Sequence, residues 1–310
     1  MTRHFLRDDD LTPAEQRQVL ELALRLKAER FAERPLAGPR AVAILFDKPT
    51  LRTQLSFTVG VAELGGHPMV VDGNLAQIGV RESVEDTAGV LGRQVAAVVW
   101  RTFHQSRLET MARHAGVPVV NALTDQFHPC QALADLLTIA EHAGGLDALR
   151  GRTLAYVGDG ANNMAHSYLL AGATAGMHVR VGTPTSRRPD ADVVDRAATV
   201  AAGTGGSVTV LHDAAAAVSG AHAVATDTWV SMGDATGAAE AEQLFGPFRL
   251  DAALLGRAEP DAVVLHCMPA YRGKEIAAEV IDGPRSVVFD EAENRLHVQK
   301  AVLTWLLERS

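Results

Sequence analysis

The chain has 310 residues, which is more than one hydrophobic core usually holds, so its length predicts two domains of about 150 residues each. Its hydrophobic content of 47% is that of a globular protein, and no apolar run approaches the ~20 residues that a membrane-spanning helix needs. A formal net charge of −8 excludes nonspecific attraction to nucleic acid, because such binding needs a basic surface.

The start of the chain and its cysteines indicate the compartment. The first ten residues are too charged to contain the apolar core of a secretory signal, so we expect a cytoplasmic protein. The two cysteines, Cys130 and Cys267, match no CxxC metal or redox spacing. We interpret both as reduced thiols and expect no bound metal.

The first half of the chain alternates between helical and strand-like segments. A helix is predicted to start at Thr12, because Pro13 and Glu15 complete a capping box, and to run towards Phe31. Ser83 has the same character at the start of a helical segment, 83–94. The strand-like runs lie at 41–46, 67–71, 95–100 and 117–120, and a largely buried helix is predicted over 129–143.

A second alternating set follows Gly144 and Gly145, which are typical of a domain boundary. Its strand-like runs lie at 153–157, 178–181, 207–211, 223–226, 263–266 and 286–289. A last helix over 292–307 has no strand after it, so we expect it to return to the first domain. The order predicts an α/β fold with two doubly wound parallel-sheet domains, residues 1–145 with the helix 292–310, and residues 146–291.

Polar segments follow the predicted strands, at the edge of a doubly wound sheet where ligands gather. They are 47–53, 101–104 and His128 in the first half, and 159–163, 227–233 and 267–272 in the second. We predict one cleft between the two domains that holds them all.

The segment after the first strand has the character of a phosphate cradle. Thr50, Arg52 and Thr53 lie at a predicted helix start, where unpaired N–H groups and the helix dipole favour an anion. In the alternative interpretation Thr50 caps the helix and Arg52 is an ordinary solvated charge.

Other motifs leave their alternatives open. Gly158 and Gly160 follow a strand as in a dinucleotide fingerprint, but Asn163 replaces the third glycine. If His266 and Cys267 both lie on a strand, their side chains point to opposite faces and cannot form a nucleophile and base pair. Asp227 and Ser231, four residues apart in a predicted loop, can bracket an ammonium and a carboxylate, or they belong to a solvated turn.

Together these segments resemble the carbamoyltransferases, and most closely the ornithine carbamoyltransferases, across nearly the whole chain. Thr50-Leu51-Arg52-Thr53 resembles the family's Ser-Thr-Arg-Thr, Arg101-Thr102-Phe103 its basic second loop, and His128-Pro129-Cys130-Gln131 its His-Pro-x-Gln. In the second half the matching segments are Asn162-Asn163, 227–233, His266-Cys267-Met268-Pro269 and 290–299. Aspartate and acylornithine carbamoyltransferases lack the Ser-Met-Gly loop, present here at 231–233.

The resemblance implies transfer of a carbamoyl group from carbamoyl phosphate to the δ-amine of L-ornithine in arginine biosynthesis, without a metal or organic cofactor. It implies that carbamoyl phosphate is bound by Thr50, Leu51, Arg52, Thr53, Gln77, Arg101, His128, Gln131, Cys267, Met268 and Arg295. It assigns ornithine to Asn163, Asp227, Ser231 and Met232, and catalytic roles to Arg101, His128, Asp227, Cys267 and Arg295. It further implies a homotrimer in which Gln77 completes the phosphate site of a neighbouring subunit.

The sequence departs from the family pattern at three positions. Leu51 removes a hydroxyl from the phosphate loop, Gln54 replaces a frequent Arg, and Tyr271 stands where the family often has His. These changes concern affinity rather than reaction type. The alternatives that remain are a carbamoyltransferase for putrescine or lysine, an NAD-dependent oxidoreductase and a noncatalytic binding protein, and the sequence does not decide between biosynthesis and catabolism.

Overall fold

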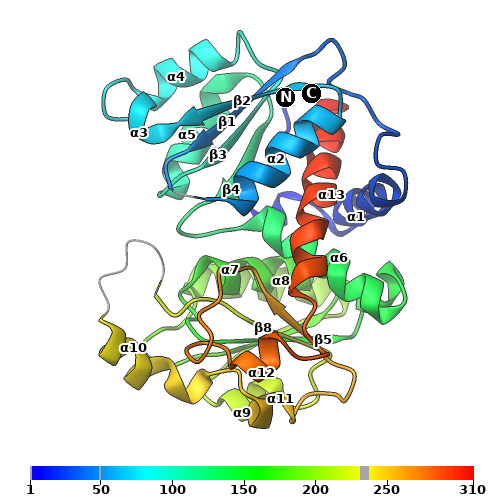
Figure 1. The fold of residues 1–310 in the computed structure, drawn as a ribbon, viewed down its shortest axis with the longest axis vertical. Coiled ribbons are helices and arrows are strands. Elements are labelled where there is room, and N and C mark those ends of the chain that lie inside the picture. Colours follow the sequence, from blue (N-terminus) through cyan, green and yellow to red (C-terminus); the bar gives the residue numbers. More distant parts are fainter. Residues whose placement is uncertain (1, 49, 231–236) are drawn as a thin grey trace. The chain divides into compact units, whose positions relative to one another are not determined.

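The computed structural model describes residues 2–48, 50–230 and 237–310, which form two compact units. The first unit is Met1–Ala134 with Glu293–Ser310, and the second is Asp135–Ala292. Each unit holds a parallel sheet with helices packed beside it (Figure 1). The predicted α/β class with two parallel-sheet domains is confirmed, and the end of the last helix belongs to the first unit.

The first unit is built on a four-stranded parallel sheet in the order β2-β1-β3-β4. Its strands are β1 (Ala41–Phe46), β2 (His67–Asp72), β3 (Ala97–Arg101) and β4 (Val119–Leu123). The helices within it are α1 (Pro13–Ala28), α2 (Arg52–Glu63), α3 (Gly73–Ala76), α4 (Val84–Leu91) and α5 (Gln105–Ala115). The central strands β1 and β3 are almost wholly buried, which explains their continuous apolar sequences.

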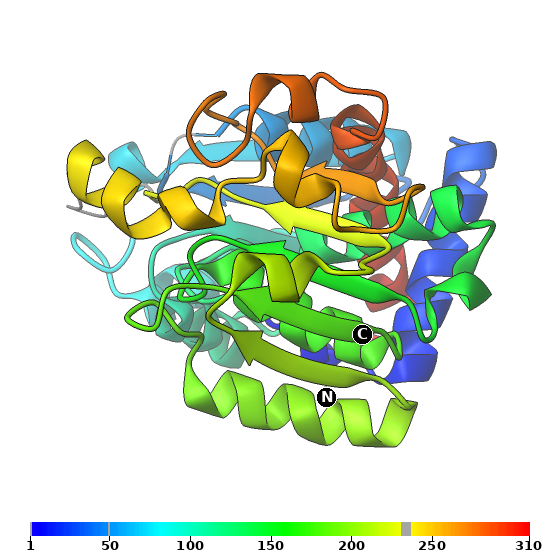
Figure 2. The same cartoon turned by 90° about the horizontal axis from the view of Figure 1, so that it is seen from below.

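The second unit holds a five-stranded parallel sheet in the order β7-β6-β5-β8-β9, and Figure 2 shows these strands side by side. The strands are β5 (Thr153–Val157), β6 (His178–Gly182), β7 (Ser207–Leu211), β8 (Ala223–Thr226) and β9 (Val263–His266). Its helices are α7 (Asn163–Thr174), α8 (Ala191–Thr204), α9 (Ala214–Val218), α10 (Ala238–Phe245), α11 (Ala252–Leu255) and α12 (Ala278–Ile281). Two helices cross the division between the units, α6 (Pro129–Ala143) and α13 (Val288–Leu307).

Two helix starts that the sequence predicts are confirmed in atomic detail. Thr12 accepts a hydrogen bond from the backbone N–H of Glu15, and the Glu15 carboxylate accepts one from the N–H of Thr12. The Ser83 hydroxyl accepts a hydrogen bond from the N–H of Asp86 at 3.0 Å. These caps depend on neighbouring residues alone, so the sequence is enough to locate them.

The predicted strand at 286–289 is wrong. Ser286 forms one isolated parallel bridge to Val264, and helix α13 already begins at Val288. Asp290 and Glu291 lie in the first turn of this helix, where negative side chains are favoured by the helix dipole. The apolar run therefore begins a helix instead of adding a strand to the sheet.

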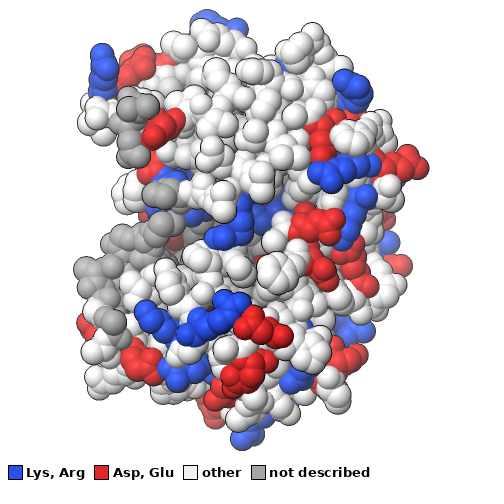
Figure 3. Space-filling view, in the orientation of Figure 1, with Lys and Arg blue, Asp and Glu red and all other residues white. Residues whose placement is uncertain are grey.

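Two further properties concern the surface. No helix among the described residues is both long and apolar enough to cross a membrane. Acidic and basic side chains are interspersed on the face drawn in Figure 3, so the net negative charge is not gathered there into one field.

Helix α7 packs close to strand β6 because Gly172 carries no side chain. A Cβ atom at Gly172 would lie 2.5 Å from Cγ2 of Val179, which is too close for an undisturbed contact. Gly203 in α8 offers the opposite situation, since a Cβ atom there would meet nothing within 4 Å.

We expect Gly172→Ala to lower the free energy of unfolding by about 1–3 kcal/mol, because Val179 must move. Gly203→Ala is the matched control and should raise it by about 0.5–1 kcal/mol through helix propensity. Thermal and denaturant unfolding of both variants tests this. Equal effects of the two substitutions would contradict the close packing of α7 on β6.

Candidate active site

The first unit presents a helix start directly after its central strand β1. Helix α2 begins at Arg52, with Thr53 buried as its second residue, so both lie where backbone N–H groups are unpaired within the helix. Leu51 holds the N-cap position and makes no side-chain cap, so Thr50 does not serve as the helix cap. The Leu51 side chain is 74% exposed, which leaves the backbone as its available contribution to an anion.

Arg295 on α13 joins residues of the first unit that lie on two other helices. Its guanidinium donates to Oγ1 of Thr53 on α2 at 2.7 Å and to Oε1 of Gln131 on α6. Helices α2 and α13 lie side by side (Figure 1), and a Cβ atom at Gly60 would meet Lys300 of α13 at 3.1 Å. The structure thus brings together residues that lie 164 and 242 positions apart in the sequence.

His128 is a neutral imidazole among positive charges. Burial lowers the pKa of His128 well below its usual value, and the charges of Arg295, Arg101 and Arg52 lower it further. A neutral ring can donate one hydrogen bond to a carbonyl oxygen without adding charge. Three arginines near one buried imidazole also concentrate positive charge in a chain of net charge −8, as an anion site requires.

Lys48 is a residue of this region that sequence reasoning missed. It is buried, and its ammonium lies 4.5 Å from the ring centroid of Phe103. Burial and then the charge of Arg101 lower the pKa of Lys48. Its place within the predicted loop, two residues before Thr50, is the signal that could have drawn attention to it.

Gln77 follows the short helix α3 and adopts a left-handed conformation with φ of 49°. Its side chain is exposed, so within this subunit it is directed away from the buried core. The role implied by the family resemblance concerns a second subunit.

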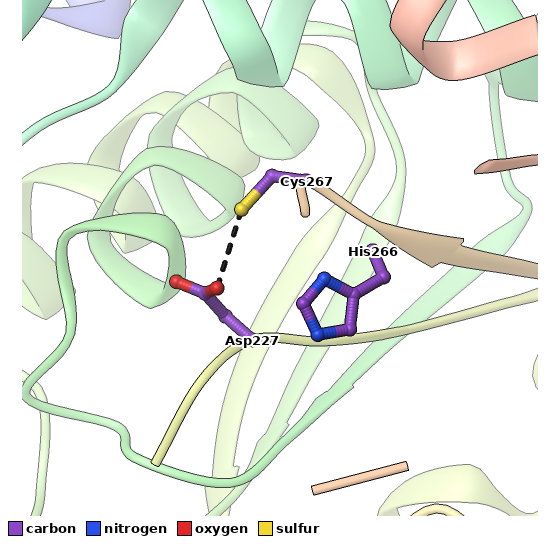
Figure 4. Close-up of side chains that lie close together, drawn as sticks. All are labelled: Asp227, His266 and Cys267. Carbon is purple, nitrogen blue, oxygen red and sulfur yellow. Dashed lines mark hydrogen bonds between the residues drawn. The ribbon is translucent and has the colours of Figure 1, made fainter. Parts of the chain in front are cut away.

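The second unit gathers its polar residues at the ends of adjacent strands. Asn162 follows β5, Asp227 follows β8 and Cys267 follows β9, and these strands are neighbours in the sheet. The Asp227 carboxylate accepts hydrogen bonds from Nδ2 of Asn162 at 3.0 Å and Sγ of Cys267 at 3.2 Å, the latter drawn in Figure 4. The backbone N–H of Thr228 donates to the same carboxylate at 2.8 Å.

The thiol of Cys267 is held in its protonated form. Burial raises the pKa of Cys267 well above its usual value, and the negative charges of Asp227 and Glu291 raise it further. A protonated thiol is a poor nucleophile, so this geometry does not favour covalent catalysis by Cys267.

His266 and Cys267 do not both lie on a strand, so strand alternation does not separate their side chains. Strand β9 ends at His266, so Cys267 lies beyond the strand, and ligand atoms of Asp227, His266 and Cys267 lie within 4.8 Å of one another (Figure 4). Both ring nitrogens of His266 are nevertheless engaged, Nδ1 with the N–H of Met268 at 2.9 Å and Nε2 with Glu275 at 3.2 Å. The three residues are therefore close enough together to bind a metal ion, but both nitrogens of the imidazole already contact other protein groups.

Glu275 is a second residue that sequence reasoning missed. Its buried carboxylate accepts a hydrogen bond from the N–H of Tyr271 at 2.5 Å and contacts His266. Met268, in the same loop, has a left-handed φ of 53°. The His266–Glu275 pair thus braces the loop that follows β9, and a lone glutamate in a loop gives no sequence signal for this.

Asn162 and Asn163 lie at the start of helix α7. Asn162 caps α7 by accepting from the N–H of Met164 at 2.7 Å, and Asn163, the predicted ligand, is the first residue of that helix. Ser231 and Met232 lie outside the described residues.

The loop after β5 does not have the free backbone N–H group at Gly160 that a bound dinucleotide would need. The N–H of Gly160, which would face a pyrophosphate, donates to Oγ1 of Thr183 at 2.9 Å. Asp159 in the same loop accepts from Nε of Arg187 at 2.9 Å. A Cβ atom at Gly160 would lie 2.6 Å from the Arg187 carbonyl oxygen, so this glycine serves internal packing.

A two-unit parallel α/β fold, with an anion-attracting arginine cluster in one unit and a carboxylate and thiol pair in the other, is the pattern of a carbamoyl-transferring enzyme. The family profile "Aspartate/ornithine carbamoyltransferase, carbamoyl-P binding domain" matches residues 3–141, and "Aspartate/ornithine carbamoyltransferase, Asp/Orn binding domain" matches residues 150–306. The chain belongs to the aspartate/ornithine carbamoyltransferase family.

Individual relatives agree over their full lengths. The chain is 60% identical to an ornithine carbamoyltransferase of Clavibacter sepedonicus, with 100% of both chains covered. It is 42% identical to the solved ornithine carbamoyltransferase from Pyrococcus furiosus, with a TM-score of 0.94 over 99% of this chain and 97% of that one. The anabolic ornithine carbamoyltransferase from Campylobacter jejuni matches with a TM-score of 0.93 at 33% identity, over 99% of this chain and 100% of that one.

The raised pKa of Cys267 predicts resistance to alkylation. At pH 8 we expect iodoacetamide to label Cys267 at least ~10-fold more slowly than free cysteine. Cys130, whose pKa burial raises to about 12, should label no faster. Asp227→Asn removes a negative charge beside the Cys267 thiol, so labelling of Cys267 alone should accelerate.

Mass spectrometry of the alkylated peptides measures both sites at once, and protein unfolded in guanidinium chloride is the control in which both thiols label. Rapid labelling of Cys267 in the folded wild-type protein would contradict a protonated thiol.

Proposed function

We propose that this chain transfers the carbamoyl group of carbamoyl phosphate to the δ-amine of L-ornithine, giving L-citrulline and phosphate. The observation that carries the proposal is the arrangement of Arg52, Arg101 and Arg295 around the neutral, buried His128. It meets the demands of a phosphate dianion and of a polarised carbonyl group at one place. The names of the relatives support ornithine as the acceptor.

The phosphate would be bound at the start of α2. Backbone N–H groups and hydroxyls of Thr50 to Thr53 suit its oxygens, and Leu51 contributes through its backbone. Arg52 and Arg101 supply charge-assisted hydrogen bonds. Neutralising the dianion also makes phosphate a better leaving group.

The carbonyl oxygen of the carbamoyl group gains negative charge as the amine attacks. Thr53, Arg101 and His128 are the proposed donors to this oxygen, and loss of one such donor typically costs ~10²–10³ in turnover. Because the imidazole of His128 is neutral, it donates without a competing proton equilibrium near pH 7. Gln131, Arg295 and the backbone at Cys267 and Met268 would orient the carbamoyl NH₂ group.

The acceptor would be bound by the second unit. Asp227 and Cys267 are the proposed neighbours of the δ-amine, and Asn163, Ser231 and Met232 those of the α-amine and α-carboxylate. Putrescine has no α-carboxylate, so it would leave the latter set unused. Lysine remains the second candidate acceptor, because it differs from ornithine by one methylene group.

The proposal includes a homotrimer, with Gln77 of one subunit reaching the phosphate site of its neighbour. Large apolar side chains of the first unit support a contact with a second copy, since Leu51, Leu55, Val70 and Val80 are exposed, Val80 at 84%. It also includes a cytoplasmic location, which the two free thiols support, and a role in arginine biosynthesis, which the anabolic relative from Campylobacter jejuni supports.

An acceptor panel tests the proposed reaction. Purified protein is incubated with carbamoyl phosphate and, in separate reactions, ornithine, lysine, putrescine, N-acetylornithine or aspartate. We expect ureido product with ornithine at least ~10-fold above lysine, because one methylene group is worth about 1–3 kcal/mol in a fitted site. Greater turnover with any other acceptor would overturn the choice of ornithine.

The pH profile tests the state of the nucleophile. The attacking amine must be neutral, and an amine of pKa near ~10.4 is neutral in on the order of one molecule in a thousand at pH 7. At low ornithine concentration, we expect the rate to rise by about tenfold per pH unit between pH 6 and 9. His128 contributes no step in this range, because its lowered pKa keeps it neutral throughout. A rate independent of pH would contradict attack by the neutral amine.

A further inference from the structure

Arg107 on α5 makes three contacts that fix the plane of its guanidinium group. Its Nη1 lies 3.1 Å from Oδ2 of Asp47, and its Nη2 donates to the carbonyl oxygen of Ile78. The guanidinium also stacks on the ring of Trp100, 5.0 Å from the ring centroid. Because the guanidinium group is planar, these contacts fix the directions in which its N–H groups donate. A lysine ammonium would supply the charge but not these fixed directions.

The ion pair of Asp47 and Arg107 contacts both ends of the segment that carries Gln77. At the beginning of this segment, a Cβ atom at Gly73 would lie 2.2 Å from Oδ1 of Asp47. At its end, a Cβ atom at Gly79 would lie 3.3 Å from Nη2 of Arg107. The backbone of segment 73–79 therefore lies directly against the pair.

Gln77 lies between these two contacts in a strained conformation. Its φ of 49° is left-handed, a conformation that is unfavourable for an L-residue other than glycine unless its surroundings hold it. The N–H of Gln77 donates to the carbonyl oxygen of Gly73 at 2.7 Å, and the next residue, Ile78, is the one held by Arg107. The ion pair thus supports the geometry that directs the exposed Gln77 side chain.

Asp47 also contacts the phosphate side of its own subunit. Its carboxylate accepts a hydrogen bond from Oγ1 of Thr102 at 2.7 Å, and its N–H donates to the carbonyl oxygen of Arg101 at 2.9 Å. Asp47 thus connects Arg107 to these loops, and Arg107 itself contacts the Gln77 segment directly through Ile78.

We propose that Arg107 is a positioning residue that sets Gln77 for the phosphate site of the neighbouring subunit, with Asp47 linking that segment to the subunit's own phosphate loops. The inference rests on the proposed function and its trimer. It assigns Arg107 an effect on the neighbour's site and Asp47 an effect on both sites.

Mixed trimers separate these effects. Arg52→Ala disables the site of its own subunit and leaves Gln77 intact, so it is mixed with a second variant after dissociation and reassembly. In a 1:1 mixture, about a quarter of the sites combine an intact Arg52 with an intact Gln77 from the neighbour. Gln77→Ala is the reference second variant, and it should restore activity to about this fraction.

We expect Arg107→Met to restore activity with Arg52→Ala to the same extent as Gln77→Ala does, because its defect lies in what it offers the neighbour. Asp47→Asn should restore less, because it also weakens its own site. In the unmixed trimer, Arg107→Met should raise the KM for carbamoyl phosphate by ~10-fold and that for ornithine by less than ~2-fold.

One control variant and one replacement variant accompany this test. Arg17→Met removes an exposed ion pair on α1, between Arg17 and Glu21 at 2.8 Å, and should leave both KM values unchanged. If Arg107→Met does not fold, Arg107→Lys replaces it, with a smaller change in the KM for carbamoyl phosphate and the same pattern of restoration.

The outcomes distinguish the inference from its premise. Wild-type protein without carbamoyl transfer would overturn the proposed function, and with it the inference. Restoration by Gln77→Ala but not by the Arg107 variant would overturn the inference alone. No restoration by either variant in an active wild-type background would overturn the contribution of Gln77 to the neighbour, and with it the role of Arg107.

Discussion

The buried guanidinium of Arg295 is the contact on which the phosphate side depends. Its hydrogen-bond acceptors come from α2 and α6, so a single cation on α13 connects three helices. A buried cation is costly without partners, and here Thr53 and Gln131 compensate while remaining neutral. Both of these partners are neutral, so neither of them cancels the charge of the guanidinium.

Burial and the charges of three nearby arginines determine the protonation state of His128. An imidazole beside a carboxylate would become protonated more readily, whereas burial and three arginines keep this ring neutral. A neutral ring is a hydrogen-bond donor that adds no further positive charge beside the arginines. The phosphate side therefore separates two tasks, with charge supplied by arginines and a neutral donor supplied by histidine.

The sequence predicts those parts of the structure that depend on near neighbours. The caps at Thr12 and Ser83 and the helix 129–143 follow from local patterns, as does the α/β alternation. The run at 286–289 has the composition of a strand, but it extends the sheet only by the isolated bridge of Ser286 to Val264. The acidic residues that follow favour a helix start instead. The partners of Arg295 lie 164 and 242 positions away, so no local pattern could assign its role, and the family resemblance was needed. Arg107 and Glu275 carry no motif, and their contacts exist only in the folded chain.

In the proposed reaction, the carboxylate of Asp227 has to attract the amine without keeping it protonated. A bare carboxylate beside the amine would favour its protonated form, although only the neutral form can attack. Asp227 is not bare, because Asn162, Cys267 and the N–H of Thr228 already donate to its oxygens. In the proposed reaction these donors would spread the charge of Asp227. The carboxylate would then attract the amine electrostatically but favour the amine's protonated form less than an isolated carboxylate would. Since the Cys267 thiol stays protonated, it adds no second negative charge that would reverse this balance.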